Sequence, residues 1–275
     1  MPLNDAAAGI LLDYAAAFAR SGRANANAFL GSSLRLLLKW RSQAISAELV
    51  AKHGGLVLGG PFAGMLYLGD ASEGGLAPRL LGTYESELHP VLEGLVARGV
   101  DRIIDVGCAE GYYAVGLARM IPDARVEAYD IDPKARAACA ELARRNEVAD
   151  RVEIRERFDI ETLDEVPTGT LVFVDAEGAE AEILSEHAPD ALRNADLIVE
   201  THPGLRPGVT ELLRDRFAPT HEVEVVRERL RPAPPELAAR FATPLDEFLA
   251  LWEWRATPTP WLVMHARAKA GDLLR

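Results

Sequence analysis

The chain has 275 residues, of which 49% are hydrophobic and 26% charged, with a formal net charge of −12 at pH 7. This length predicts one α/β domain with an N-terminal addition. The acidic balance argues against nucleic acid as a partner, because a face that docks on phosphates needs a basic excess. Two distant cysteines, Cys108 and Cys139, exclude a disulfide framework and a zinc site. The sequence shows neither a basic, apolar leader nor a membrane-spanning apolar run, so we expect a cytoplasmic protein without a membrane partner.

Residues 1–80 are predicted to form a helical extension with a short β-like segment. Helical spacing covers 5–20 and 25–52, whereas 54–70 mixes glycine, proline and apolar residues, as expected for short strands or a tight loop pair. One apolar stripe of the second helix is expected to face a core, and it consists of Leu30, Leu34, Leu37, Leu38 and Ile45. The two helices are interpreted as a substrate cap or as the interface of a homodimer, and the sequence leaves both open.

Residues 81–275 alternate strand-like and helix-like segments after a predicted helix at 84–98. The expected strands are 102–106, 125–129, 151–155, 170–174, 197–199, 222–226 and 261–265. Such alternation is typical of right-handed βαβ units, and it predicts a doubly wound, seven-stranded, mostly parallel sheet with helices on both faces. A proline-bounded insertion at about 231–260 carries an amphipathic helix that is interpreted as a lid or as a packing helix.

The first strand of this pattern ends in a glycine-containing loop, residues 105–111 (DVGCAEG). Ligands of open parallel sheets bind beyond the carboxyl ends of the strands, so this loop is the first candidate site. Gly107 permits a tight turn, the small Ala109 lets a ligand approach the backbone, and Gly111 brings the next helix close to the strand. The spacing differs from the G-x-G-x-x-G of dinucleotide folds. Asp105 would repel a pyrophosphate but could accept a hydrogen bond from a cationic amine, so the loop suits an amino-acid ligand.

A second acid, Asp130, stands at the tip of the second predicted strand. An acid at this place accepts both hydroxyls of a ribose in nucleotide folds. Asp132 is the more natural N-cap of the helix at 133–146, which leaves Asp130 free. Ile131 is expected to cover one face of an adenine. Asp159, after the third strand, contacts the adenine amino group or only caps the helix that follows.

Together these features resemble the class I S-adenosylmethionine-dependent methyltransferases over roughly 80–230 and 260–270, with Ala109 replacing the middle glycine of the motif E/D-x-G-x-G-x-G. The resemblance implies S-adenosylmethionine as cofactor and S-adenosylhomocysteine as product, bound by a methyltransferase domain at 81–275. It implies that Asp105, Gly107 and Gly111 line the methionine moiety, with Cys108 and Ala109 in the same loop, and that Asp130 binds the ribose.

The fourth and fifth strands end in acids and a histidine, which the topology brings toward the expected methyl position. These residues are Asp175, Glu177 and Glu180 after the fourth strand, and Glu200 and His202 after the fifth. His202 is the best candidate for a general base, because imidazole titrates near neutral pH. Asp175 and Glu200 orient this base, or Asp175, Glu177, Glu200 and His202 hold a divalent ion, which we do not favour. Glu180 could instead face solvent.

The pattern V-D-x-E-G-x-E followed by I-V-E-T-H resembles the FkbM-type methyltransferases. This resemblance implies O-methylation of a hydroxyl on a small molecule, natural product or saccharide. An RNA or protein methyltransferase, which the acidic charge disfavours, and a non-catalytic protein of the same fold remain as alternatives. Before the domain, Tyr84 and Glu85 close over the cofactor, or they belong to a helix capped by Thr83 with Ser86 and Glu87 in its first turn.

Overall fold

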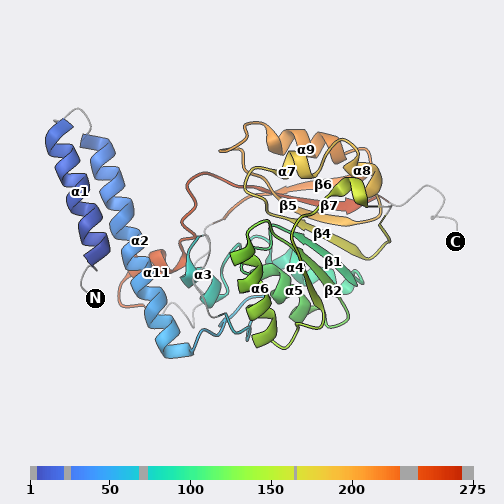
Figure 1. Cartoon of the computed structure of the whole chain (residues 1–275), viewed down its shortest axis with the longest axis horizontal. Helices are drawn as coiled ribbons and strands as arrows, with labels where there is room; N and C mark the ends of the chain where they lie inside the picture. The colour runs from blue at the N-terminus through green and yellow to red at the C-terminus, as the bar shows by residue number, and fades with distance from the viewer. Residues whose placement is uncertain (1–4, 22–25, 68–73, 164–165, 230–240, 268–275) are drawn as a thin grey trace.

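The structure, a computed structural model, describes residues 5–21, 26–67, 74–163, 166–229 and 241–267. Its centre is a seven-stranded sheet in the order β3-β2-β1-β4-β5-β7-β6 (Figure 1). The strands are β1 (Arg102–Val106), β2 (Arg125–Tyr129), β3 (Val152–Arg155), β4 (Thr170–Val174), β5 (Asp196–Glu200), β6 (His221–Val226) and β7 (Trp261–Ala266). All neighbours pair in parallel except β7, which runs antiparallel to β5 and β6. The predicted doubly wound, mostly parallel fold is confirmed.

The sheet separates two hydrophobic cores, because successive residues of a strand face opposite sides. On β1, Ile103 belongs to the core under α4 (His89–Ala97), α5 (Tyr112–Met120) and α6 (Pro133–Arg145). Its neighbour Ile104 belongs to the core under α7 (Glu180–Ile183), α8 (Ala188–Ala191) and α9 (Val209–Phe217). Figure 1 shows these two sets of helices on opposite sides of the sheet. Both faces are therefore covered, and the carboxyl edge of the parallel strands is where a ligand can enter.

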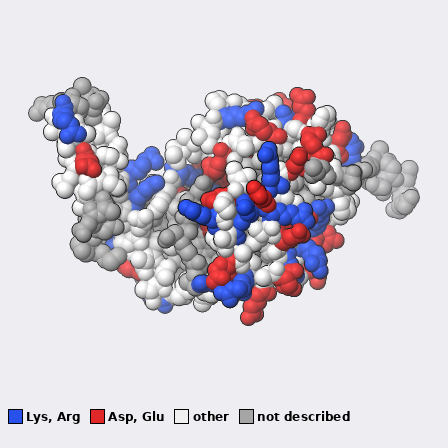
Figure 2. All heavy atoms as spheres, viewed as in Figure 1, with Lys and Arg blue, Asp and Glu red and all other residues white. Residues whose placement is uncertain are grey.

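The N-terminal extension is a hairpin of α1 (Asp5–Ser21) and α2 (Ala26–His53) that projects from the sheet domain (Figure 1). The Phe18 and Phe29 rings stack 4.7 Å apart between its two arms. The second half of α2 packs on α3 (Leu76–Leu81) and α11 (Pro244–Leu251), and there Ile45 is buried as predicted. Figure 2 shows few charged side chains on the hairpin, whereas both signs are interspersed over the domain.

The prediction that the whole apolar stripe of α2 faces a core is wrong for its first half. Leu30, Leu34 and Leu37 are exposed, because this part of the helix extends beyond the domain with α1 beside it (Figure 1). Homodimer formation through this hairpin stays a prediction. None of the described helices is long and apolar enough to cross a membrane.

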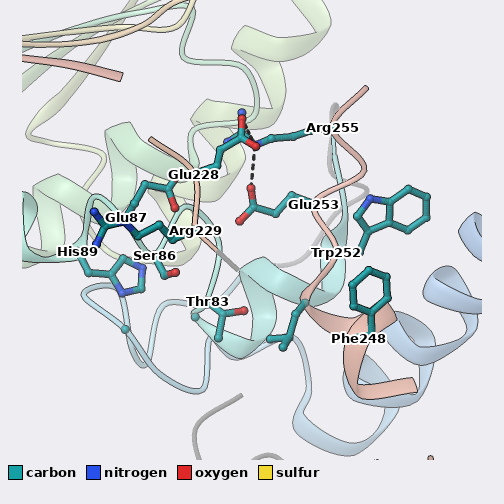
Figure 3. A pocket seen from close by; sticks show the side chains of 13 residues that line it. Thr83, Ser86, Glu87, His89, Glu228, Arg229, Phe248, Trp252, Glu253 and Arg255 are labelled. Atoms are coloured by element: carbon teal, nitrogen blue, oxygen red, sulfur yellow. Dashed lines mark hydrogen bonds and ion pairs between the residues drawn. The ribbon is translucent and has the colours of Figure 1, made fainter. Parts of the chain in front are cut away.

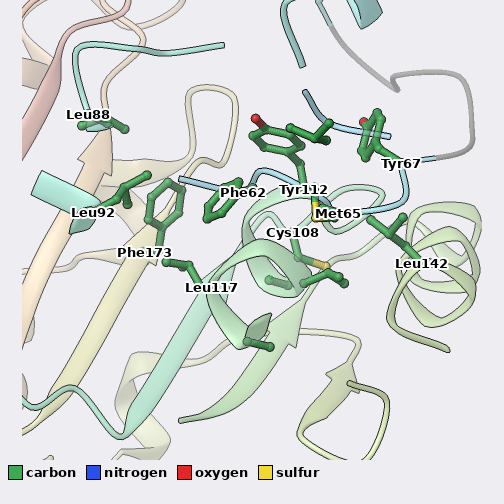
Figure 4. Packing of buried hydrophobic residues seen from close by; sticks show 14 of the residues in the cluster. Phe62, Met65, Tyr67, Leu88, Leu92, Cys108, Tyr112, Leu117, Leu142 and Phe173 are labelled. Atoms are coloured by element: carbon green, nitrogen blue, oxygen red, sulfur yellow. The ribbon is translucent and has the colours of Figure 1, made fainter. Parts of the chain in front are cut away.

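The segment before the gap at 68–73 forms the tight loop pair rather than strands, with a single bridge between Leu56 and Leu66. Its side chains fill the core over α5, as Figure 4 shows for Phe62, Met65 and Tyr67 beside Tyr112. Phe62 lies so close to Gly116 that a Cβ there would meet its ring at 2.6 Å. The extension is thus joined to the domain by a continuous apolar core.

The helix predicted at 84–98 begins five residues later, as α4, and residues 84–88 form turns. The N-cap is Leu88 without a side-chain cap, so the prediction of Thr83 as the cap is wrong. Pro90 explains the difference, because a proline is tolerated in the first turn of a helix but not in its interior. Glu85 and Glu87 therefore lie in the turn before α4 and not in the helix itself.

Of the insertion at 231–260, residues 231–240 lie outside the described part. The rest contains α11, which is capped by the Thr243 hydroxyl. Arg41 of α2 pairs with Asp246 at 2.7 Å, and the Ser42 hydroxyl donates to the carbonyl of Leu249 at 3.1 Å. The helix therefore packs on the extension, and its end contributes to a cavity described below.

The β1 loop approaches the β4 loop so closely that only glycine fits at position 107. Gly107 has φ +87°, and a Cβ there would lie 1.7 Å from the carbonyl oxygen of Asp175. A side chain would force apart the two loops that form the carboxyl edge of the sheet. The glycine at this position is therefore required by packing as well as by backbone conformation.

We expect Gly107→Ala to lower the free energy of unfolding by about 2–6 kcal/mol, from left-handed strain plus overpacking. Urea denaturation measures this change. Gly94→Ala in α4 is the matched control, since a Cβ there meets nothing within 4 Å and helix propensity favours alanine. Equal stability of the two variants would contradict this packing.

Candidate cofactor and methyl-transfer site

A cavity of about 690 Å³ opens at the carboxyl ends of β1, β2 and β4, and we call it the cofactor cavity. Volumes of this size are typical of small-molecule sites. Its lining contains Val106, Gly107, Ala109, Tyr129, Asp130, Ile131, Phe158, Asp159, Ile160, Asp175, Ala176, Glu177 and Ala179. The lining thus joins three strand ends, as expected at the switch point of a doubly wound sheet.

The loop after β1 is held against the tip of β2 by its own backbone. Ala109 adopts φ +48°, and its amide donates to Oδ2 of Asp130 at 2.9 Å. Cys108 is buried, and Gly111 faces Cys139, whose Sγ a Cβ at that position would meet at 2.7 Å. Among these loop residues, Gly107 and Ala109 reach the cavity, whereas Cys108 and Gly111 are not among its lining.

Asp130 lies at the tip of β2, lines the cavity and does not cap α6, as predicted, but its carboxylate already accepts two backbone amides. Oδ2 accepts the Ala109 amide, and Oδ1 accepts the Asp132 amide at 2.7 Å. Asp132 caps α6 as predicted, accepting from the Lys134 amide at 2.9 Å. Each carboxylate oxygen of Asp130 keeps a second lone pair, so it can still accept from a ligand hydroxyl.

Asp105 lies beneath the cavity rather than in its lining. Its side chain is 2% exposed, and Oδ2 has no hydrogen-bond partner. Burial, and then the charge of Asp130, raises the pKa of Asp105 to about 7, although a hydrogen bond from the Ala114 amide opposes this. An orphaned buried carboxyl beside the loop fits the predicted role of accepting from a cationic amine.

Of the remaining residues predicted to bind the cofactor, Ile131 and Asp159 line the cavity, whereas Tyr84 and Glu85 do not. Ile131 lines the cavity and is highly exposed, and Asp159 lines it while accepting from the Glu161 amide at 3.1 Å. Tyr84 and Glu85 are absent from this lining among the described residues. Tyr84 lies under the guanidinium of Arg79, 3.8 Å from its ring centre.

His202 stands at the centre of the predicted catalytic residues. Its Nε2 lies 3.5 Å from Glu177 Oε2, 3.7 Å from Glu200 Oε2 and 3.8 Å from Asp175 Oδ1. Asp175 and Glu177 also line the cofactor cavity, so this histidine adjoins it. Parallel strand ends thus bring together the four residues that the sequence places after β4 and β5.

Glu180, for which the sequence left a solvent-facing position open, is fully buried and holds His202. Its Oε1 lies 2.7 Å from His202 Nδ1 and also accepts the Gly178 amide at 2.8 Å. Burial would raise the pKa of Glu180, but these contacts outweigh it and lower the pKa. An ionised carboxylate only accepts, so Nδ1 carries the hydrogen and Nε2 faces the cavity side.

The charges around His202 favour its protonated form. Burial alone would lower its pKa, but Glu180, Glu200 and Glu177 together raise the pKa above the usual 6.5. Burial, and then the charge of Glu200, raises the pKa of Asp175 well above its usual range. A base at this position therefore becomes available only when the pH exceeds the ordinary value for histidine.

Arg255 holds the site together and was not predicted from the sequence. Its guanidinium pairs with Glu200 and Glu85, and Nε lies 2.8 Å from Glu253. Glu85 also accepts from the hydroxyl of Tyr113. Burial, and then the charge of Glu200, raises the pKa of Glu85 to about 8 despite Arg255. Only the position of Arg255 after a tryptophan-rich helix end marks it in the sequence, and that pattern has no catalytic meaning by itself.

Three of the clustered residues could offer ligands to a metal ion. Among the described residues, Asp175, Glu200 and His202 have potential ligand atoms within 4.8 Å of one another. Glu200 also pairs with Arg255, however, and the fixed positive charge of the guanidinium opposes a divalent cation. The arrangement therefore fits a positioned base better than a metal centre.

Residues 103–200 match a protein-family model described as "Methyltransferase domain". This match supports a class I methyltransferase, whereas the domain bounds at 81–275 stay a prediction. The match runs from β1 to the end of β5, so it includes the β1 loop, Asp130, Asp175 and Glu200. It supports S-adenosylmethionine as the cofactor of the cavity.

One curated relative is the ribosomal protein L11 methyltransferase of Methylococcus capsulatus, which is 44% identical over 52 residues. This stretch is 19% of the present chain and 17% of the relative, so the chain matches a small part of that protein's length. The substrate in that protein's name is therefore not carried over.

Solved methyltransferases resemble the chain only distantly. The O-methyltransferase TomG of Streptomyces achromogenes, in complex with S-adenosylmethionine, is 18% identical with a TM-score of 0.43, over 66% of this chain and 81% of that one. An O-methyltransferase of Bacillus cereus with bound S-adenosylhomocysteine is 16% identical with a TM-score of 0.42, over 64% and 79%. The precorrin-6y C5,15-methyltransferase of Geobacter metallireducens is 16% identical with a TM-score of 0.44, over 65% and 87%. Such similarities carry no argument about the acceptor.

The buried Asp105 gives the free protein a pH-dependent stability. The pKa of Asp105 is about 7 in the folded protein, against 3.8 for an ordinary aspartate. Its contribution to the free energy of unfolding is therefore fully present below pH 3.8 and is lost as the pH rises through 7. The wild type should lose this stability between pH 4 and pH 8, whereas Asp105→Asn should not. We therefore expect the free energy of unfolding of the variant minus that of the wild type to rise by roughly 2–4 kcal/mol between these pH values. Urea denaturation at both pH values measures it. Asp150→Asn, at an exposed position, is the control, and a difference that does not change with pH would contradict the burial of this carboxyl.

Proposed function

We propose that the protein transfers the methyl group of S-adenosylmethionine to a hydroxyl of a small molecule, with His202 as general base. The observation that carries this proposal is the position of His202: its Nδ1 is fixed by buried Glu180, and its Nε2 faces the residues that line the cofactor cavity. The methyltransferase match over 103–200 and the FkbM-type pattern around β4 and β5 support it.

The lining of the cavity fits the cofactor in its chemistry. Asp130 offers acceptor lone pairs to ribose hydroxyls, and the exposed Ile131 offers an apolar face to an adenine. Asp105, with an orphaned oxygen beneath the β1 loop, suits the amino group of the methionine moiety. When bound, S-adenosylmethionine supplies an electrophilic methyl group on a sulfonium and leaves as S-adenosylhomocysteine.

The residues around His202 then have separate tasks. The acceptor oxygen forms a bond to the methyl carbon while the methyl–sulfur bond breaks, with its electron pair remaining on sulfur, and the hydroxyl proton passes to His202 Nε2. Glu180 stabilises the imidazolium that forms, through the hydrogen bond at Nδ1. Glu200, held by Arg255, and Asp175 keep the imidazole oriented between the two loops.

A hydroxyl acceptor is favoured over nucleic acid or protein by the net charge of −12. A screen of methyl transfer from tritiated S-adenosylmethionine distinguishes the candidates, with small hydroxyl compounds, RNA and protein extract as acceptors. We expect label only in the small compounds. A non-catalytic protein of this fold would bind the cofactor and label none of them.

Asp130→Asn tests the cofactor assignment, because it keeps the size of the side chain and removes its charge. We expect the affinity for S-adenosylmethionine to fall by about 1–3 kcal/mol, as for a lost charge-assisted hydrogen bond. Isothermal titration calorimetry measures it, and Asp123→Asn on the exposed turn before β2 is the control. Unchanged affinity in Asp130→Asn would remove the ribose from this position.

His202→Ala tests the base. We expect kcat to fall about 10²–10⁴-fold with cofactor affinity preserved, whereas His187→Ala at an exposed position leaves kcat unchanged. Since the base must be neutral, wild-type kcat should rise with pH through a midpoint above 6.5, and the variant should lack this dependence. Full activity of His202→Ala, or activity that a chelator abolishes and Mg²⁺ restores, would contradict a histidine base.

A further inference from the structure

A second cavity of about 400 Å³ lies next to the Arg255 network, and we call it the outer cavity (Figure 3). It shares none of the described lining residues of the cofactor cavity. The two are connected through side chains, since Arg255 of the outer cavity pairs with Glu200, and Glu200 and Asp175 both face His202 Nε2. A molecule in the outer cavity is therefore separated from the base by one layer of ion pairs.

The outer cavity is built outside the matched methyltransferase domain. Its lining comes from the turns before α4, the end of β6 and the end of α11, all outside 103–200. The lining includes Ser86, Glu87, Glu228, Phe248, Trp252 and Glu253. Segments that differ from the shared domain are where a protein of this fold sets its acceptor, because function depends on sites added to a common scaffold.

Acidic side chains outnumber basic ones in this cavity, and negative charge exceeds positive charge when Glu87 is ionised. Three carboxylates line it, those of Glu87, Glu228 and Glu253, against the guanidinium groups of Arg229 and Arg255. Arg255 is also shared with Glu85 and Glu200, both buried. Figure 3 shows Glu228 and Glu253 reaching toward Arg255, with Glu87 nearby. The remaining charge favours a cation.

One oxygen of the Glu87 carboxyl has no hydrogen-bond partner. The side chain is 8% exposed, and Oε1 is buried without a hydrogen-bond partner. Burial raises its pKa to about 7. A buried acceptor without a donor is unfavourable unless a ligand supplies the donor, so this carboxyl points to a ligand that donates hydrogen bonds.

Two aromatic residues also contribute to the lining. Phe248 and Trp252 lie at the end of α11, away from Glu87 and Glu228 (Figure 3). Phe248 is about half exposed, so its ring is available to a ligand. Such faces bind apolar ring surfaces and, through their electron-rich faces, ammonium groups.

From the charge, the unpartnered oxygen of Glu87 and the two aromatic residues, we propose that the outer cavity binds the methyl acceptor, and that this acceptor is a hydroxyl compound carrying a protonated amine. The ammonium lies among Glu87, Glu228 and Glu253, and the hydroxyl reaches His202 by displacing the ion pair between Arg255 and Glu200. This inference rests on the proposed function, because a compound in the outer cavity is a methyl acceptor only if the protein transfers methyl groups. The preference for an amine over a neutral compound can be measured without any reaction.

Three matched pairs of probes isolate the amine, because in each pair an ammonium replaces a hydroxyl of similar size. The pairs are ethanolamine and ethylene glycol, tyramine and tyrosol, and D-glucosamine and D-glucose. Isothermal titration calorimetry and ligand-observed NMR on the full chain, with S-adenosylhomocysteine present, report binding of each probe. We expect at least one amine to bind about tenfold more tightly than its neutral partner, the gain of a charge-assisted hydrogen bond.

Glu87→Gln keeps the size of the side chain and removes its charge. We expect this variant to lose most of the preference for the amine while binding the neutral partner unchanged. Glu93→Gln, exposed on α4, is the matched control and should retain the preference. Thermal denaturation checks that both variants fold. If Glu87→Gln does not fold, binding of the three probe pairs to the wild-type protein still decides the question.

Neutral partners that bind as tightly as the amines, or three amines that do not bind at all, would overturn the inference. Titration of S-adenosylmethionine in the same buffer separates the two proposals. Cofactor binding without amine binding defeats only the acceptor class, and amine binding without cofactor binding defeats the proposed function while leaving the outer cavity a cation site.

Discussion

The site depends on one guanidinium that pairs with two buried carboxyl groups. Glu85 and Glu200 are 1% and 3% exposed and come from a turn before α4 and the tip of β5, and Arg255 pairs with both. A buried charge whose partner is removed is strongly destabilising. The pairs therefore fix the position of the C-terminal segment against the sheet edge. Because Glu200 also faces His202, the same guanidinium positions the base and separates the two cavities.

Backbone strain is concentrated around this guanidinium and the β1 loop. Five described residues other than glycine have positive φ, and four of them, Glu85, Ala109, Glu177 and Trp254, border the cavities or adjoin Arg255. Left-handed backbone costs of order 1–3 kcal/mol per residue and persists only where the surroundings over-determine it. Ala109 is held by the hydrogen bond to Asp130, and Glu85 by its pairs with Arg255 and Tyr113. Packing and ion pairing thus maintain a strained but preorganised site.

The sequence predicted most of the sheet, because buried parallel strands are short apolar runs with helices between them. The order of those strands also explains why Asp175, Glu200 and His202 were expected to meet, since parallel strand ends share one edge. The short helices α7 and α8 were not predicted, because four residues are too few to display a helical period. The helix predicted at 84–98 begins instead at His89, because the ring of Pro90 is tolerated only in the first turn of a helix.

The long-range contacts of the site residues could not be predicted from local sequence patterns. Arg255 contacts residues 55 and 170 positions away, and no local period relates them. The hydrogen bond from the Ala109 amide to Asp130 comes from another loop. The role of Glu180 likewise depends on His202, which follows a different strand. Long-range pairing of this kind depends on how the loops fold over the sheet edge.

A crystal structure of the protein with S-adenosylhomocysteine tests the central claim most directly. We predict the adenosine between Asp130 and Ile131, and the sulfur near Gly107 and Asp175, on the side where His202 Nε2 and the outer cavity approach. A product bound in the outer cavity, or bound with its sulfur directed away from His202, would contradict the account.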